Sequence, residues 1–187
     1  FPGLTRPRPV APAPADPSIT ALAAALPPAL RMGTSSWSFT GWRGLVYAGR
    51  PDQRRLANFG LPAYAAYPLF RTVGLDRTFY RPMTREQLAD LADQVPGDFR
   101  FLVKAHQAIT RLHELDRKGG SIGPNPTFLD AAYAAERVIA PSVEGLGEKC
   151  GPILFQFSPM RLDRSYTAGR IVDWIGRFLG SLPRGPM

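Results

Sequence analysis

The sequence predicts an α/β protein organised around a parallel β-sheet. Its 187 residues suffice for one substantial core, and 44% hydrophobic against 20% charged residues is an ordinary globular composition. Four short apolar segments, each bounded by Gly, Pro or charged residues, alternate with helical patterns, as buried parallel strands do. We expect these strands at residues 30–35, 71–79, 99–105 and 152–157.

The chain opens with a segment rich in proline and alanine, residues 1–29, which has no hydrophobic periodicity before Ser18. Such a composition favours a flexible arm. One short helix is expected inside it, at residues 18–25. The folded domain is therefore placed at residues 30–187.

The intervals between the expected strands carry helical patterns of unequal strength. Residues 56–70 form the weakest pattern, because one glycine and two prolines interrupt it. Residues 84–95 form the clearest, since Thr84 and Gln87 have the spacing of a capping box. Two further helices are expected at residues 127–139, ended by Pro141, and at residues 166–182.

The net charge of +8 is concentrated in one part of the chain. Residues 31–85 carry nine arginines against two aspartates, for +7, whereas residues 86–187 are balanced. This distribution favours a region that attracts anions or nucleic acid. The alternative is a genome-wide bias toward arginine, because arginines outnumber lysines twenty to three.

Several classes of protein find no support in the sequence. No apolar run approaches the ~20 residues of a membrane span, and no secretory signal is present, which favours a cytoplasmic protein. The single Cys150 excludes an intrachain disulfide and gives no support for a cysteine metal site. Phosphate-cradling glycine patterns, a serine nucleophile elbow and a dinucleotide fingerprint are missing. We predict neither a metal nor a cofactor.

Four segments in chain order carry a family resemblance. They read GTSSWSFTGW, TVGLDRTFYR, DFRFLVKAHQAIT and LGEKCGPILFQFSP, and they span roughly residues 31–160. Together they resemble the YecE-like family, also called domain of unknown function 72 (DUF72). The resemblance implies a TIM-type β/α barrel, but it implies no agreed reaction, cofactor or catalytic residue.

The chain departs from the family pattern at five positions. In the second segment the family pattern has Glu, Asn and Ser where this chain has Gly74, Asp76 and Arg77. In the third segment, His106 stands where the family has Pro, and Arg111 where it has His. An activity that needs the family Glu or His is therefore not expected of this chain.

The length is a further departure. A closed eight-stranded barrel usually needs ~250 residues, whereas residues 30–187 supply only about four strand-and-helix units. We therefore expect the amino-terminal half of a family barrel, truncated at its carboxyl end. Such a partial barrel exposes sheet edges and an inner face, so self-association or pairing with a second barrel half is expected.

In such barrels the active face is formed by the carboxyl ends of the strands. Ser36, Trp37 and Trp42 follow the first strand and are predicted to bind substrate, because hydroxyls and indoles suit a sugar or base ring. The alternative is that both tryptophans only pack the mouth of the barrel.

Two residues at the next strand ends are predicted to be catalytic. Asp76 is a candidate for acid–base work, and Lys104 for a general base or Schiff-base lysine with apolar walls around it. The alternatives are an ordinary surface pair for Asp76 with Arg77 and a strand-end lysine whose ammonium reaches water.

Three further polar residues complete the predicted substrate site. Tyr80 and Arg81 follow the second strand, and Arg81 is the better candidate for an anion contact. Gln156 is placed in the fourth strand, facing inward, where it either fixes a substrate group or serves as a satisfied barrel residue.

Three function hypotheses follow. The first is a barrel enzyme acting on a small polar, anionic or sugar-like substrate. The second is a nucleic-acid binding or processing protein, motivated by the basic stretch and its aromatic residues. The third is a non-catalytic, truncated remnant of a barrel, which follows from the missing carboxyl half and from Gly74 and Arg111 in place of the family Glu and His.

Overall fold

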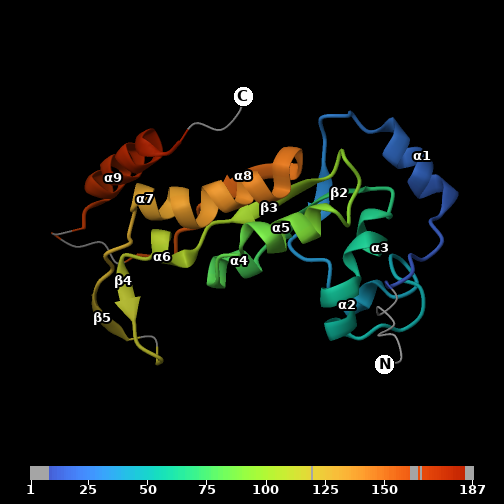
Figure 1. Ribbon diagram of the computed structural model, residues 1–187, viewed down its shortest axis with the longest axis horizontal. Coiled ribbons are helices and arrows are strands. Elements are labelled where there is room, and N and C mark those ends of the chain that lie inside the picture. Colours follow the sequence, from blue (N-terminus) through green and yellow to red (C-terminus); the bar gives the residue numbers. More distant parts are fainter. Residues whose placement is uncertain (1–8, 119, 161–163, 165, 184–187) are drawn as a thin grey trace, which may run out of the picture.

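The computed structural model describes residues 9–118, 120–160, 164 and 166–183 (Figure 1). Its centre is a four-stranded sheet in the order β1-β2-β3-β6, in which every neighbouring pair is parallel. The predicted α/β class with a parallel sheet is therefore confirmed. The strands are β1 (Met32–Thr34), β2 (Phe70–Leu75), β3 (Arg100–Lys104) and β6 (Cys150–Leu154).

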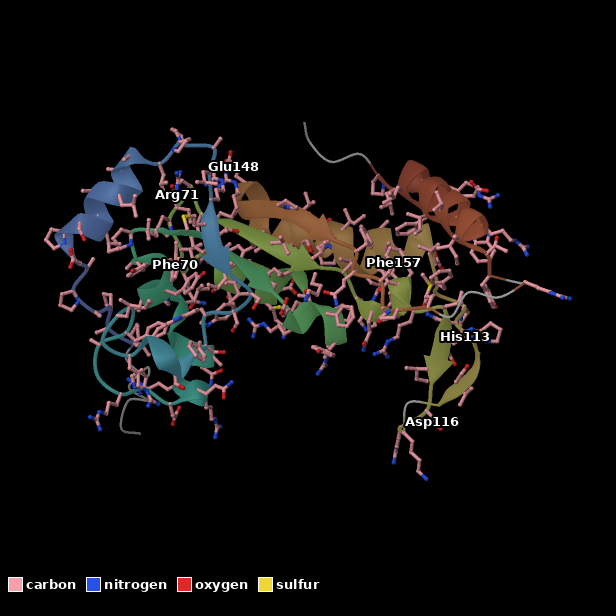
Figure 2. The ribbon with its side chains drawn as sticks, turned by 180° about the vertical axis from the view of Figure 1, so that it is seen from behind. Phe70, Arg71, His113, Asp116, Glu148 and Phe157 are labelled. Atoms are coloured by element: carbon pink, nitrogen blue, oxygen red, sulfur yellow. The ribbon has the colours of Figure 1, made fainter. Side chains whose placement is uncertain are left out.

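Because the strands are parallel, their carboxyl ends lie at one edge of the sheet and their amino ends at the other. Arg71 is the second residue of β2, and Glu148 precedes β6. Figure 2 shows both toward one end of the molecule. Phe157, which follows β6, lies toward the other end, with His113 beyond it.

The core lies between the sheet and the helices that cover it, among them α5 (Arg85–Ala92) and α8 (Ala140–Leu146), and it continues into residues 46–64. Burial alternates along the central strands: Val73 and Val103 are buried, whereas Gly74, Leu102 and Lys104 are only partly covered. The helices therefore cover one face of the sheet, and the opposite face carries the alternate residues. The capping box predicted at the start of α5 is present.

The remaining helices agree broadly with the sequence prediction. The helix expected at residues 18–25 is α1 (Pro17–Ala25), and the one expected at 166–182 is α9 (Ala168–Ser181). The weak pattern at residues 56–70 becomes two short helices separated by Gly60, namely α2 (Gln53–Phe59) and α3 (Leu61–Ala65).

The second strand is shorter than predicted. The expected strand at residues 71–79 ends at Leu75, and α4 (Arg77–Tyr80) is one helical turn. The buried Thr78 hydroxyl lies within hydrogen-bond distance of two carbonyl oxygens, that of Leu75 at 2.5 Å and that of Lys104 at 2.6 Å. One contact is local and the other tertiary, and together they favour the turn over the β propensity of Thr, Phe and Tyr.

The helix that Pro141 was expected to end continues past it. α7 (Ala131–Ala134), the π-helical turn η2 (Ala135–Ile139) and α8 follow one another directly, and Figure 1 shows them as one continuous rod. In η2 the Ala140 amide donates to the carbonyl of Ala135, five residues back. This wider turn accommodates a proline, which has no N–H to donate.

A hairpin that the sequence prediction missed extends from the carboxyl end of β3. It consists of β4 (His113–Leu115) and β5 (Ser121–Pro124), which pair antiparallel after the single-turn helix α6 (Gln107–Thr110). Figure 1 shows it projecting at the end of the molecule that also carries α9. Two short 3₁₀ turns, η1 (Thr40–Trp42) and η3 (Gly147–Lys149), complete the fold.

Part of the predicted flexible arm is packed against the domain. The Val10 side chain is 5% exposed, and its amide donates to the carbonyl of Phe59 at 3.0 Å. The amide of Ala13 donates to Val46, and that of Ala48 donates back to Ala11, both at 2.9 Å. Residues 10–13 of the expected arm therefore pack against residues 46–59 in this structure. Residues 1–8 lie outside the described part of the chain.

Candidate functional site

The loop that follows β1 is fixed by a buried tyrosine. The Tyr64 hydroxyl accepts a hydrogen bond from the Thr34 amide at 2.9 Å and donates to the carbonyl of Thr72 at 3.1 Å. It thus ties the carboxyl end of β1 to β2. Burial raises the pKa of Tyr64 above its ordinary value, which keeps this hydroxyl protonated and able to donate.

Trp37 serves as the anchor of this loop. Its side chain is only 6% exposed, and its indole N–H donates to the carbonyl of Ala57 at 3.3 Å. The Tyr47 hydroxyl donates to the Trp37 carbonyl. Trp37 is therefore buried beneath the loop, which fits the alternative that this residue packs the protein rather than binds substrate.

Trp42 lies at the centre of an aromatic cluster. Its ring centroid is 5.3 Å from Phe39, 6.1 Å from Tyr64 and 5.9 Å from Phe70. Such edge and tilted contacts rigidify the base of the loop. Trp42 is nevertheless partly exposed, and its edge reaches a cavity above the cluster.

This cavity, which we call the β1 pocket, opens at the carboxyl end of β1. Its volume is about 460 Å³, within the range of about 300–1,000 Å³ of small-molecule sites. The predicted residues Ser36 and Trp42 both line it, whereas Trp37 does not. The full lining consists of Thr34, Ser35, Ser36, Ser38, Phe39, Thr40, Trp42 and Gln53.

The two residues predicted to be catalytic contact each other. The Lys104 Nζ lies 2.8 Å from Asp76 Oδ1, so the carboxyl ends of β2 and β3 are joined by an ion pair. The Lys104 side chain is 16% exposed and that of Asp76 is 42% exposed. The pair is therefore shielded on the lysine side and open to solvent on the carboxylate side.

Two neighbours hold Lys104 in place. The ring of Phe79 lies beneath its ammonium, 5.7 Å from Nζ to the ring centroid, which is the geometry of a cation–π contact. The hydrogen bond from Thr78 to the Lys104 carbonyl fixes the backbone of the same residue. The single helical turn α4 thus positions both members of the pair.

The β1 pocket and the ion pair belong to adjacent loops. The guanidinium of Arg77 lies over the Trp37 ring, 5.3 Å from its centroid. Gly74 also allows β1 to approach β2 closely, because a Cβ built on it would lie 3.2 Å from the Cα of Ser35. These contacts hold the loops after β1 and β2 together at the carboxyl edge of the sheet.

His106 follows the ion pair along the chain and is held on two sides. Its Nδ1 lies 2.9 Å from the Tyr133 hydroxyl, and the backbone of Tyr80 lies beside its ring. Burial lowers the pKa of His106, and the positive charges of Arg111 and Arg137 lower it further. A neutral imidazole therefore bridges β3 to α4 and α7.

The other predicted substrate residues are not brought together with the pair. Tyr80 is 69% exposed, and Arg81 is exposed beside it. Gln156 is exposed and lies beyond β6, which ends at Leu154, so its placement in the fourth strand is wrong. The sequence prediction did not include Phe39, which lines the β1 pocket. It could have been found as the one aromatic residue between Ser38 and Thr40 in a polar loop.

The arginines of the basic stretch are spread over the molecule. Arg31 and Arg71 contact Asp98 at the amino end of the strands, and Arg43 donates to the carbonyl of Pro51. Arg85 lies near two glutamates of α5 and α8. Within the described residues, no group of three or more His, Cys, Asp or Glu side chains has the arrangement of a metal site.

A four-stranded parallel sheet with helices packed on it places this chain in the class of α/β proteins. The family model described as "Protein of unknown function DUF72" matches residues 31–187, so the chain belongs to the DUF72 family. This confirms the resemblance carried by the four sequence segments. A search of curated proteins gives no match.

One solved structure of the same family resembles the fold, and a second one gives a weaker match. A DUF72 family protein from Enterococcus faecalis, solved at 3.10 Å, has a TM-score of 0.50 and 22% identity over 80% of this chain. A 2.52 Å structure of a DUF72 family protein from the same organism has a TM-score of 0.39 and 22% identity over 66% of this chain. This chain spans 46% and 45% of their lengths. No helix among the described residues has the length and apolar character needed to cross a membrane.

Proposed function

We propose that this chain carries the catalytic edge of a TIM-type barrel enzyme that acts on a small polar substrate. In this proposal the four strands of the sheet are part of a barrel, and their carboxyl ends form the active face. The observation that carries it is the 2.8 Å ion pair between Asp76 and Lys104, which come from the ends of neighbouring strands.

The pair is suited to proton transfer next to an oxygen atom. The solvent-facing carboxylate of Asp76 takes a proton from a substrate hydroxyl or from a carbon beside a carbonyl. The ammonium of Lys104 has three donors, of which one points at Asp76, so another stabilises the negative charge that develops on the substrate oxygen. Asp76 is the base and Lys104 the electrostatic partner.

Substitutions at the pair test this function. We expect the purified protein to consume at least one member of a panel of small hydroxylated and carboxylated metabolites, followed by proton NMR. Asp76→Asn and Lys104→Met should each lower the rate at least about 100-fold, the usual contribution of a positioned acid or base.

A second ion pair provides the matched control. Arg71 and Asp98 also join β2 to the β3 region with a 2.9 Å contact, but at the amino ends of the strands. Arg71→Met and Asp98→Asn should leave the rate unchanged. Equal consumption by all variants contradicts the roles of Asp76 and Lys104, and no consumption by any protein favours a non-catalytic remnant.

A nucleic-acid function makes a different prediction. If the basic stretch bound a phosphate backbone, oligonucleotide affinity would fall steeply with salt concentration. A salt titration with single- and double-stranded oligonucleotides therefore separates the two functions. We expect no salt-dependent complex, because several arginines of the stretch contact the protein itself.

A further inference from the structure

We infer that the β1 pocket binds the ring of a neutral, polyhydroxylated molecule, such as a sugar or a polyol. This inference rests on the proposed function and names the substrate class for it. Of the eight residues that line the pocket, five carry a hydroxyl, one carries an amide and two are aromatic. None is charged.

The hydroxyl groups of the pocket match those of a sugar. A serine or threonine hydroxyl both donates and accepts, and so does each sugar hydroxyl. Ser36 Oγ accepts a hydrogen bond from the Ser38 amide at 3.2 Å and lies 3.0 Å from Ser38 Oγ. These bonds fix the two side chains in a turn, and their remaining lone pairs are available to a ligand.

Phe39 supplies the apolar wall that such a ligand needs. Its side chain is 58% exposed, and its ring meets Trp42 edge to face at 5.3 Å. The C–H face of a sugar ring packs on an exposed aromatic ring, which removes apolar surface of both from water. The exposed ring of Phe39 therefore has a stacking role that the packed ring of Trp42 cannot fill.

Gly41 determines where that ring lies. A Cβ built on Gly41 would be 2.4 Å from Cε1 of Phe39, so the ring rests directly over the Gly41 backbone. Any larger residue at this position must push the ring away. A substitution at Gly41 therefore displaces the Phe39 ring without removing it.

The absence of charge in the lining selects against anionic ligands. A buried carboxylate or phosphate needs a cationic partner to offset its lost hydration. The charged residues next to the lining are engaged with the protein: Arg43 donates to the carbonyl of Pro51, and Asp52 accepts from the Arg55 amide. Arg77 lies over the ring of Trp37. A neutral ligand in the β1 pocket would lie beside the loop that carries Asp76, which is the proposed base.

Binding measurements on the full chain test this inference. The neutral probes are D-glucose, D-ribose and myo-inositol, and the anionic probes are D-gluconate and D-glucose 6-phosphate. Saturation-transfer NMR should detect a neutral probe with a dissociation constant on the order of 1 mM, equivalent to about 4 kcal/mol. The anionic probes should bind more weakly.

Three variants act on separate features of the pocket. Phe39→Ala, Gly41→Ala and the double variant Ser36→Ala/Ser38→Ala should each raise that dissociation constant at least about tenfold. Leu179→Ala is the control for an exposed apolar side chain, since it is 51% exposed on α9, and Ser121→Ala is the control for an exposed hydroxyl. Both controls should bind as the wild type does.

Each outcome decides between the inference and the function on which it rests. No saturation transfer from any neutral probe, stronger binding of the anionic probes, or unchanged affinity in folded variants overturns the inference. If neutral probes fail while Asp76→Asn still abolishes turnover of another substrate, only the substrate class is wrong. If neutral probes bind while Asp76→Asn leaves turnover unchanged, only the catalytic pair is wrong.

Discussion

Lys104 illustrates how single residues position the site. Its ammonium is held between the Asp76 carboxylate and the Phe79 ring, and its carbonyl accepts the Thr78 hydrogen bond. Three of these four residues fall within five consecutive positions at the end of β2 and in α4. A change in this short segment therefore alters both the charge and the position of Lys104.

His106 gives a pH-dependent prediction at the same scale. Its pKa in the folded chain lies below the ordinary value of 6.5, mainly because of burial, so the unfolded chain binds a proton there more readily. The stability that His106 confers is therefore complete above its unfolded pKa and is lost as the pH falls toward the folded one. The positive charges of Arg111 and Arg137 act in the same direction.

We expect the free energy of unfolding of the wild type to fall as the pH drops below 6.5, the ordinary pKa of histidine. His106→Gln should reduce this fall, because glutamine cannot take up the proton. Urea unfolding at several pH values, read by circular dichroism, measures the effect. If the free energy of unfolding depends on pH equally in the two proteins, the pKa of His106 is not lowered by folding.

Residue roles could be predicted from the sequence only in part. Asp76, Lys104, Ser36 and Trp42 were chosen as residues at strand ends. Asp76 and Lys104 lie at the carboxyl ends of β2 and β3, and Ser36 and Trp42 line one pocket beside β1. Their mutual contacts could not be predicted, because the 2.8 Å pair depends on the register of β2 against β3. The burial of Trp37 could not be predicted either, because its indole bonds to the carbonyl of Ala57, twenty residues away.

At the scale of elements, the contact between α5 and α8 depends on one glycine. A Cβ built on Gly145 would lie 2.5 Å from the Arg85 carbonyl oxygen and 2.7 Å from the Leu88 Cβ. The two helices can approach this closely only because the side chain is missing. The layer that covers the sheet therefore depends on Gly145.

Substitution of this glycine should separate the two helices. Gly145→Ala is expected to destabilise the fold by about 1–3 kcal/mol, as overpacking does. Gly176→Ala is the matched control, because no atom lies within 4 Å of its added Cβ on α9, and helix propensity predicts a gain of about 0.5–1 kcal/mol. Thermal unfolding compares the two, and equal stability in both variants would contradict the role of Gly145.

Local signals predicted the elements where the cause of the structure is local. The capping box at Thr84 and the apolar strand segments are examples, and both appear as expected. The errors arise where other contacts override the local pattern. Thr78 reaches the distant carbonyl of Lys104 where β2 ends, and the π-helical turn η2 lets the helix continue through Pro141.

At the scale of the whole molecule, the described sheet has one uncovered face. Lys104 pairs in register with Leu154, whose side chain is 43% exposed, and the partly covered Leu102 lies on the same face. β1 and β6 are the outer strands among the described residues. An apolar face with two open edges favours association with another chain.

We therefore expect this chain to associate with itself through the uncovered face. Sedimentation velocity over a range of concentrations should show a monomer–oligomer equilibrium. Leu154→Lys should weaken it at least about tenfold, equivalent to about 1.4 kcal/mol. Leu179→Lys, at a comparably exposed position on α9, should not. A monomer at all concentrations would contradict this expectation.

The central claim is that the β1 pocket and the Asp76–Lys104 pair form one site. A titration of the labelled protein with D-glucose, followed by backbone amide NMR, tests it most directly. The account predicts shift changes that cluster at residues 35–40, at Gln53, at Asp76 and Arg77, and around Lys104. Changes confined to the hairpin at residues 113–124, or to the β1 loop without Asp76 and Lys104, would contradict it.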